Sequence, residues 1–147
     1  MTSDGFGRAG GDPSNRYFLT GYAAHDVCRL VTVGRATGRP HDIEMWFGVK
    51  QETLYLISGN GPAADWYRNL LAEPRVEVRF GNDARIGFAH DVTDAAERRI
   101  VGEVMGQKYG GWGGDPGIGL SEHDWLWKVP AAAISGWQVL DPPPPSP

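Results

Sequence analysis

Apolar and polar residues alternate in several short stretches of this chain, and such alternation is typical of strands that bury one face. Residues 75–80 give the clearest case, because three charged residues alternate there with three apolar ones. The same kind of pattern predicts strands over residues 27–33, 42–49, 53–57, 75–80 and 85–92, with a last strand inside 127–139.

Two other stretches have the spacing of helices. Residues 63–72 place Trp66 and Leu70 on one face of a short helix. Residues 94–109 form the second predicted helix, with Thr93 as its N-cap. The side chains expected to face the core from this second helix are Ala96, Ile100 and Val104.

The predicted order of elements is β-β-β-α-β-β-α-β, and two helices are too few for a parallel βαβ sheet. We therefore predict a mainly β fold with flanking helices (α+β), built as a partly open antiparallel barrel. Residues 16–140 are expected to form this single domain. The Gly-rich residues 1–15 are expected to be disordered, and the proline-rich tail 141–147 to be extended.

Charge and composition narrow the classes of function. The net charge is −4 and basic runs are missing, which argues against nucleic acid as a partner. No stretch approaches the roughly 18 consecutive apolar residues of a membrane span, and the N-terminus lacks the apolar core of a secretory signal. Cys28 is the single cysteine, so an intrachain disulfide cannot form and a cytoplasmic location is expected.

A Gly-rich turn between the first two strands carries two arginines. Residues 29–47 predict a hairpin whose tip presents Arg35, Thr37 and Arg39. Guanidinium groups pair well with phosphate and carboxylate oxygens, and a rigid sheet can hold them toward a charged cofactor. The turn by itself also fits an ordinary solvated hairpin tip.

A second candidate site lies in residues 58–62, where a strand meets the start of a helix. Unpaired N–H groups at a helix start favour negative charge, and Gly59 lets a ligand approach the backbone closely. Ser58 and Asn60 can hydrogen-bond a carbonyl or phosphate oxygen. For Asn60, a helix cap without ligand contact is the alternative.

Four segments, in this order, resemble the deazaflavin-dependent nitroreductase/quinone reductase family. They read LVTVGRATGRPHDIEMWF, LYLISGNG, DWYRNLLAEPRVEVRFG and HDVTDAAER, and the resemblance covers roughly residues 27–139. It implies the split β-barrel of flavin-binding domains, with reduced coenzyme F420 as the cofactor. Because side chains alternate along a strand, Trp46 is expected to face away from Met45 and Phe47.

The resemblance also implies which residues hold each part of the cofactor. Its phosphate tail meets the first hairpin, and its ring meets the second strand and the 58–62 turn. The residues so implied are Arg35, Thr37, Arg39 and His41 at the tail, Met45, Trp46 and Phe47 at the ring, Ser58, Gly59 and Asn60 at the ring or linker, and Trp66 and Asn69 on the next helix.

The substrate side is implied at the end of the second helix. Tyr109 is the candidate catalytic residue, because a phenol can give a proton to the oxygen that becomes negative when hydride arrives. Tyr109 and Trp112 are the candidate substrate-binding residues, and the surrounding glycines suit a closing lid. A helix end followed by a mobile loop is the alternative.

The predicted function is hydride transfer from reduced F420 to an electron-poor small molecule such as a quinone, nitroarene or enone. The family often has basic residues where Ala36 and Gly59 stand here, which keeps flavin mononucleotide (FMN) open as the cofactor. A non-enzymatic lipid- or cofactor-binding protein is the third hypothesis. Trp127 and Trp137 suit either a core or an interface, so a monomer and a homodimer both remain open. The four histidines are scattered, and no metal site is predicted.

Overall fold

The computed structural model describes residues 13–140, so residues 1–12 and the predicted tail 141–147 lie outside the described part. A helical turn already begins at Pro13, within the segment 1–15 that was expected to be disordered. The helices and strands are α2 (Pro13–Arg16), β1 (Cys28–Val33), β2 (Pro40–Met45), β3 (Gly48–Lys50), β4 (Thr53–Ile57), α3 (Asp65–Ala72), β5 (Arg75–Phe80), β6 (Asp83–Asp91), α4 (Ala95–Tyr109), α5 (Glu122–Trp127) and β7 (Ala131–Gln138).

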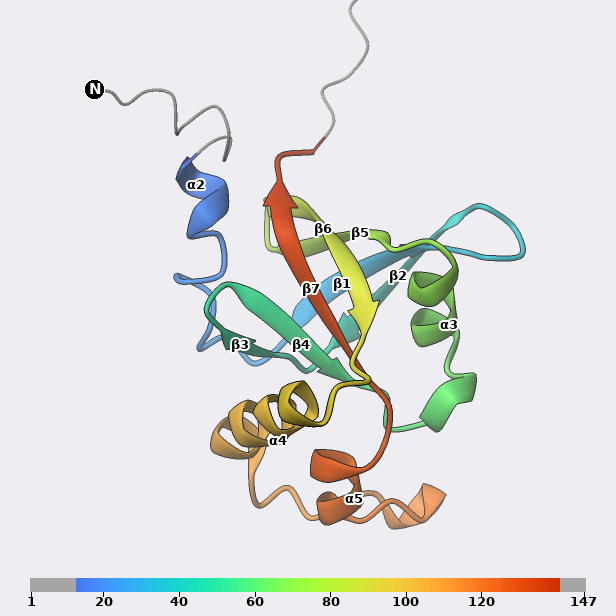
Figure 1. Cartoon of the computed structure of the whole chain (residues 1–147). Helices are drawn as coiled ribbons and strands as arrows, with labels where there is room; N and C mark the ends of the chain where they lie inside the picture. The colour runs from blue at the N-terminus through green and yellow to red at the C-terminus, as the bar shows by residue number, and fades with distance from the viewer. Residues whose placement is uncertain (1–12, 141–147) are drawn as a thin grey trace, which may run out of the picture.

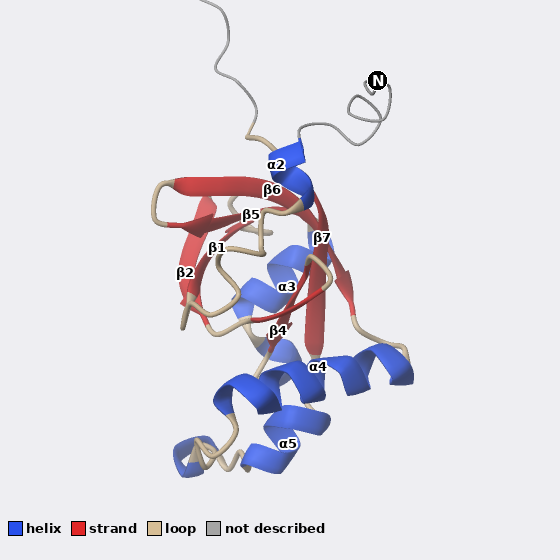
Figure 2. Ribbon diagram, turned by 90° about the vertical axis from the view of Figure 1, so that its left-hand side faces the viewer, coloured by secondary structure: helices blue, strands red, loops and turns tan. Residues whose placement is uncertain are grey.

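All seven strands form one antiparallel sheet in the order β2-β1-β5-β6-β7-β4-β3. The sheet curls into a half-barrel, with α3 packed along it and α4 and α5 together at one end (Figures 1 and 2). The mainly β fold with flanking helices and the split antiparallel barrel are therefore confirmed. Its two edge strands, β2 and β3, follow one another in the chain, so a single short crossing joins the two edges.

That crossing breaks the strand that was predicted over residues 42–49. β2 ends at Met45 and β3 begins at Gly48, because Trp46 and Phe47 carry the chain from one edge of the sheet to the other. Phe47 is fully buried, whereas 40% of the Trp46 surface is exposed. The prediction of one continuous strand was wrong, since period-two alternation does not reveal which partner strand each half pairs with.

Helix α4 differs from the predicted one in two details. The α4 N-cap is Asp94, whose carboxylate accepts the Glu97 N–H, and Thr93 does not cap the helix. The α4 face that is fully buried is rotated by one residue from the predicted stripe. Ala96 is exposed and Ile100 and Val104 are half-buried, while the buried positions are Val101, Gly102 and Met105.

The short helix α5 was not predicted. Ser121 is its N-cap and accepts a hydrogen bond from Asp124 N–H. The spacing of Ser121 and Asp124 is a helix-start signature that the sequence does carry. Two short 3₁₀ turns, η1 (Gly61–Ala63) and η2 (Pro116–Ile118), precede α3 and α5.

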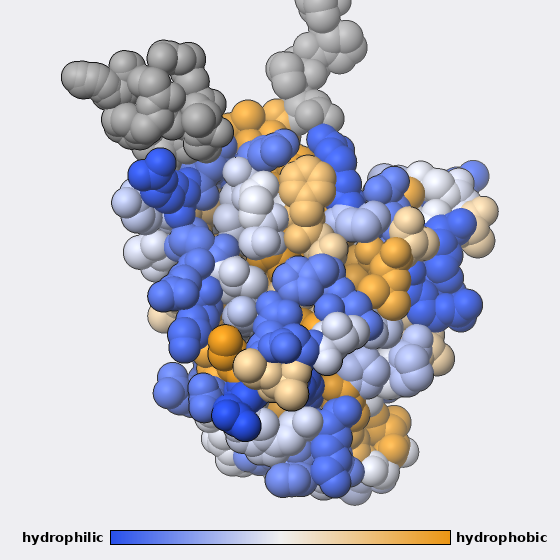
Figure 3. Space-filling view, viewed as in Figure 1, coloured by the Kyte–Doolittle hydropathy of each residue, from blue (hydrophilic) through white to orange (hydrophobic). Residues whose placement is uncertain are grey.

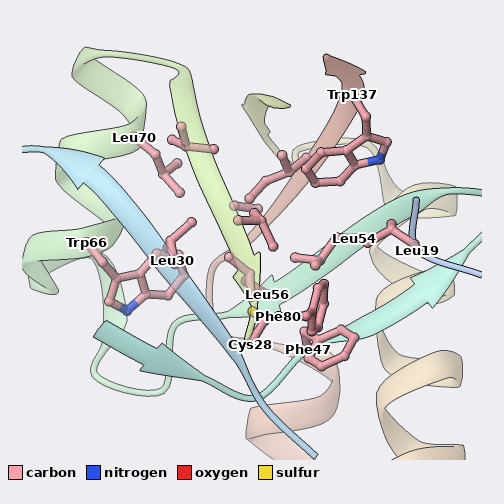
Figure 4. Packing of buried hydrophobic residues seen from close by; sticks show 14 of the residues in the cluster. Leu19, Cys28, Leu30, Phe47, Leu54, Leu56, Trp66, Leu70, Phe80 and Trp137 are labelled. Atoms are coloured by element: carbon pink, nitrogen blue, oxygen red, sulfur yellow. The ribbon is translucent and has the colours of Figure 1, made fainter. Parts of the chain in front are cut away.

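Two apolar cores hold the fold together. Inside the barrel, Phe47 packs beside Phe80 at 5.3 Å between ring centres, and Trp66 and Leu70 come from α3 (Figure 4). The second core lies between the sheet and the α4–α5 pair. On the face seen in Figure 3, apolar side chains reach the surface in small patches between hydrophilic ones. Within residues 13–140, none of the helices has both the length and the apolar character that crossing a membrane requires.

Gly102 sets how closely α4 and α5 approach. A Cβ atom at this position would lie 2.0 Å from the Trp127 ring, so only glycine lets the indole rest on the helix backbone. Arg98 adds a second tie, because its guanidinium donates hydrogen bonds to the carbonyls of Leu126 and Val129. Trp127 itself stays 38% exposed.

Candidate active site

A cavity of about 310 Å³ opens beside the crossing that joins the two sheet edges. The end of β2 forms one side, and the end of β4 with its following turn forms another. The first turn of α3 and the segment before and within α5 complete the wall. The lining residues are Glu44, Met45, Trp46, Ile57, Gly59, Asn60, Trp66, Trp112, Asp115, Ile118, Leu120 and Trp125. We call this space the seam cavity.

Four indole rings dominate the wall of the seam cavity. Trp46 meets Trp112 and Trp125 edge-to-face, at 5.6 Å and 5.7 Å between ring centres, and Trp112 and Trp125 are 5.2 Å apart. Trp66 contributes the fourth ring from α3. The indole N–H of Trp112 is buried and has no hydrogen-bond partner among the described residues. A planar aromatic ligand with a hydrogen-bond acceptor matches such a wall.

The turn after β4 is built so that glycine faces the cavity. Ser58 is fully buried, and its hydroxyl donates a hydrogen bond to the Gly61 carbonyl at 2.6 Å, so it shapes the turn from beneath. A Cβ atom at Gly59 would lie 3.2 Å from Leu120, in the segment before α5. Asn60 is exposed on the cavity wall. Of the three predicted residues of this turn, Gly59 and Asn60 line the cavity and Ser58 supports them.

Tyr109 lies behind Trp46, and it is not among the described residues that line the cavity. Its ring stacks on the Trp46 indole, with 4.5 Å between ring centres and 10° between planes. Its hydroxyl donates to the Asp26 carbonyl at 2.6 Å and accepts the Phe47 N–H at 3.1 Å. Burial raises the pKa of this phenol to about 12. The predicted proton transfer from Tyr109 stays a prediction, and this geometry favours a different role.

The hairpin arginine Arg35 is tied to α3. Its backbone N–H and its guanidinium both donate to the Asn69 side-chain oxygen, at 3.1 Å and 2.7 Å, and the guanidinium also pairs with Asp65 at 3.0 Å. Asn69 is 2% exposed and donates in turn to the Thr32 hydroxyl at 3.2 Å. Sequence reasoning missed Thr32 and Asp65 in this network. Its polar groups satisfy one another and hold the hairpin against the helix.

The other tail-binding candidates remain at the hairpin. Arg39 is exposed, and its backbone N–H donates to the Thr37 hydroxyl at 3.1 Å within the turn. His41 lies opposite Thr32 in the β1–β2 register, and its Nδ1 is buried without a partner among the described residues. The structure therefore separates two groups. Met45, Trp46, Gly59, Asn60, Trp66 and Trp112 meet at the seam cavity. Arg35, Thr37, Arg39 and His41 lie on the hairpin, Asn69 binds the hairpin from α3, and Phe47 lies in the core.

Sequence reasoning missed the part of the wall that precedes and enters α5. Asp115, Ile118, Leu120 and Trp125 line the cavity from this segment. Trp125 belongs to the second core and also lines the cavity. The carboxylate of Glu122 holds the neighbouring loop by accepting the N–H groups of Gly111 and Gly113, which lowers its pKa.

The charged side chains also differ between the seam cavity and the hairpin. Glu44 and Asp115 are the charged residues among those that line the seam cavity in the described part, and neither Lys nor Arg is among them. The charge on the cavity wall is therefore negative, which suits an uncharged aromatic group better than an anion. At the hairpin, Arg39 is exposed and His41 Nδ1 has no partner among the described residues. Within residues 13–140, no group of three or more His, Cys, Asp or Glu side chains is arranged to hold a metal ion.

Comparisons with known proteins agree with this geometry. The sequence profile of F420H(2)-dependent quinone reductase matches residues 14–112. An F420-H2 dependent reductase (FDR-A) superposes with a TM-score of 0.58 at 17% identity, covering 76% of this chain and 95% of that one. A conserved hypothetical protein from Mycobacterium tuberculosis gives 0.59 at 20% identity, covering 80% and 76% of the two chains.

A putative pyridoxamine 5'-phosphate oxidase from Listeria innocua gives a TM-score of 0.56 at 20% identity, covering 80% of this chain and 88% of that one. At these identities the structural likenesses establish the fold. No curated protein matches the chain. The profile match spans most of the barrel and reaches Trp112 on the cavity wall. The chain thus belongs to the F420H2-dependent quinone reductase family, and it is an oxidoreductase that uses coenzyme F420.

Proposed function

We propose that the seam cavity is where this enzyme brings F420 and a planar, electron-poor acceptor together. When bound, reduced F420 supplies the hydride, and a quinone, a nitroarene or an enone is the acceptor class. The observation that carries the proposal is the wall of four indoles around a space of about 310 Å³, bordered by a glycine turn. Stacked aromatic faces hold a flat ligand in a fixed orientation and exclude water.

Each side of the cavity has a distinct task in this proposal. Trp46, Trp112 and Trp125 present ring faces and edges to the ligands. Gly59 lets a ring approach the backbone, and the Asn60 amide supplies hydrogen-bonding groups beside it. The unpartnered N–H of Trp112 supports hydrogen bonding to an acceptor oxygen that gains negative charge.

The anionic tail of F420 has its partners at the hairpin. Arg39 and His41 are the groups we assign to it, because Arg39 is exposed and His41 Nδ1 has no partner in the described part of the chain. Arg35 is committed to Asp65 and Asn69, so its task is to hold the hairpin in place. This revises the equal roles that the sequence suggested for the two arginines.

Titration of the purified protein with F420, and separately with FMN, tests the proposal. We expect F420 to quench tryptophan fluorescence with saturation, because indoles surround the cavity. We also expect reduced F420 to be oxidised when menadione or a nitrofuran is added. Binding of FMN with no binding of F420 would contradict the proposal. Binding of F420 without hydride transfer to either acceptor would contradict the proposed acceptor class.

The compartment and the oligomeric state are part of the same proposal. We place the enzyme in the cytoplasm, and we expect a homodimer in which the exposed Trp127 lies near the contact. Sedimentation of the wild type and of Trp127→Gln tests the second statement. A shift from dimer to monomer in the variant supports it, and a monomeric wild type contradicts it.

A further inference from the structure

The two-residue crossing between the sheet edges is fixed from the end of α4. The Phe47 N–H donates to the Tyr109 hydroxyl oxygen at 3.1 Å, and the Phe47 carbonyl accepts from Lys108 Nζ at 3.0 Å. The Tyr109 hydroxyl has one proton, and the short bond to the Asp26 carbonyl takes it. Both polar groups of the Phe47 backbone are therefore held by neighbouring residues of one helix.

The same helix end fixes the side chain of Trp46. The Tyr109 ring lies almost parallel to the indole, and the edges of two further indoles meet it at 82° and 89°. Trp46 lies outside both β2 and β3, so no strand pairing orients it. Because 40% of its surface is exposed, its rotamer depends on these ring contacts, and Tyr109 provides the stacked one.

The Lys108 side chain completes this arrangement from beneath. Its ammonium lies 3.5 Å from the centre of the Phe47 ring, which anchors the buried half of the crossing in the barrel core. Tyr109 thus holds the residue that faces the cavity, and Lys108 holds the residue that faces the core. The two neighbours act on the same backbone segment from the two sides.

We propose that Tyr109 and Lys108 are positioning residues, which hold the Trp46 indole as a wall of the seam cavity and act on ligand binding through it. This inference rests on the proposed function of the cavity. It assigns Tyr109 a different task from proton donation, because its hydroxyl is bonded to backbone groups on the side away from the cavity. It also assigns a task to Lys108, which the sequence had not singled out.

A double-mutant cycle between Tyr109→Phe and Trp46→Ala tests the proposal by measuring the Kd for F420. Tyr109→Phe keeps a ring but removes both hydroxyl hydrogen bonds, and we expect about a tenfold weaker affinity. Trp46→Ala removes the wall, and we expect a loss at least as large. Because Tyr109 acts through Trp46, the double variant should bind no more weakly than Trp46→Ala alone. Multiplying losses would overturn the proposal.

Tyr22→Phe is the matched control. Tyr22 also stacks on another ring, Phe80, at 4.4 Å and 5°, and its hydroxyl also donates one hydrogen bond, to Asp83. Tyr22 is not among the residues that line the cavity. Removing its hydroxyl should therefore lower the melting temperature without changing the Kd for F420. An equal loss of affinity in this control would mean that the Tyr109 effect reports stability alone, and it would overturn the proposal.

Lys108→Met keeps the alkyl chain over Phe47 and removes the donor to its carbonyl, so it serves where Tyr109→Phe does not fold. We expect weaker F420 affinity, a higher KM for menadione and a smaller change in kcat. An unchanged Kd and KM in a folded Lys108→Met protein would overturn its part of the proposal. If the wild-type protein does not bind F420, the proposed function is wrong. If the wild type binds F420 but the effects of Tyr109→Phe and Trp46→Ala on the Kd multiply, only the positioning proposal is wrong.

Discussion

The hairpin and the seam cavity both lie against α3, yet they use their polar groups in opposite ways. At the hairpin, Arg35, Asn69 and Thr32 bond to one another, and the charge of Arg35 is paired with Asp65. At the cavity, indole rings surround open space, and the Trp112 N–H has no partner in the described residues. A cluster of hydrogen-bond donors in a sequence can serve to hold two segments of the fold together. A ligand site can instead consist mainly of aromatic rings, with an unpartnered donor among them.

The largest expected effect comes from breaking the hairpin network. Asn69→Leu leaves the buried Thr32 hydroxyl and the Arg35 N–H without their amide partner. We expect a loss of about 2–3 kcal/mol in the free energy of unfolding, measured with urea, because buried polar groups then go unsatisfied. Arg68→Ala, an exposed position on the same helix, should change it by less than about 0.5 kcal/mol.

If the network only holds the hairpin, the folded Asn69→Leu protein should lose no more F420 affinity than Arg39→Ala does, at most about fivefold or ~1 kcal/mol. A loss of affinity as large as that of Trp46→Ala would erase the contrast between the two regions. Asn69 would then regain the cofactor role that the sequence suggested.

A smaller effect separates the two arginines. Arg35→Ala should lower the free energy of unfolding by about 1 kcal/mol, because its bonds to Asn69 and Asp65 are partly exposed. Arg39→Ala should leave stability unchanged but weaken F420 binding by about threefold to fivefold at low salt, with the difference shrinking as salt screens the tail. The reverse outcome, with Arg35→Ala weakening binding and Arg39→Ala destabilising the fold, would contradict the assignment.

The smallest effect concerns the loop that carries Trp112. The pKa of Glu122 is lowered by the N–H groups of Gly111 and Gly113, so its hold on the loop is complete above the ordinary pKa of a glutamate. The hold is lost as the pH falls through the lowered value. We expect tryptophan fluorescence to change over that acidic range in the wild type.

Glu122→Gln should lack this acid transition, because an amide does not titrate there. Glu103→Gln, on the exposed face of α4, is the matched control and should keep it. A transition that survives in Glu122→Gln would show that another group controls the loop.

Local patterns predicted most of the barrel, because each strand carries its own alternation. Residues 53–57 and 75–80 are strands with the predicted bounds. The break at Trp46–Phe47 could not be predicted in this way, since it depends on β2 and β3 pairing at opposite edges of the sheet. Helix α5 was missed because six residues give too little periodicity, although its capping signature was present.

The site was predicted in part for the same reason. Residues close in sequence, such as Met45 with Trp46 and Gly59 with Asn60, were placed at the site, and each pair does line the cavity. Their roles as cofactor ligands remain predictions. The partnership of Arg35 with Asp65 and Asn69 joins segments about 30 positions apart, and no local pattern reveals which cations are already paired.

The residue at position 102 controls the distance between α4 and α5, because glycine leaves room there for the Trp127 ring. Trp127 rests on that glycine, and Trp125, two positions earlier on the same short helix, forms part of the cavity wall. A methyl group at residue 102 does not fit beside the Trp127 ring, so we expect α5 to shift outward and to move the Trp125 indole with it. Substitutions at this remote position are therefore a route to enzymes that accept bulkier substrates while every residue around the ligand keeps its chemical identity.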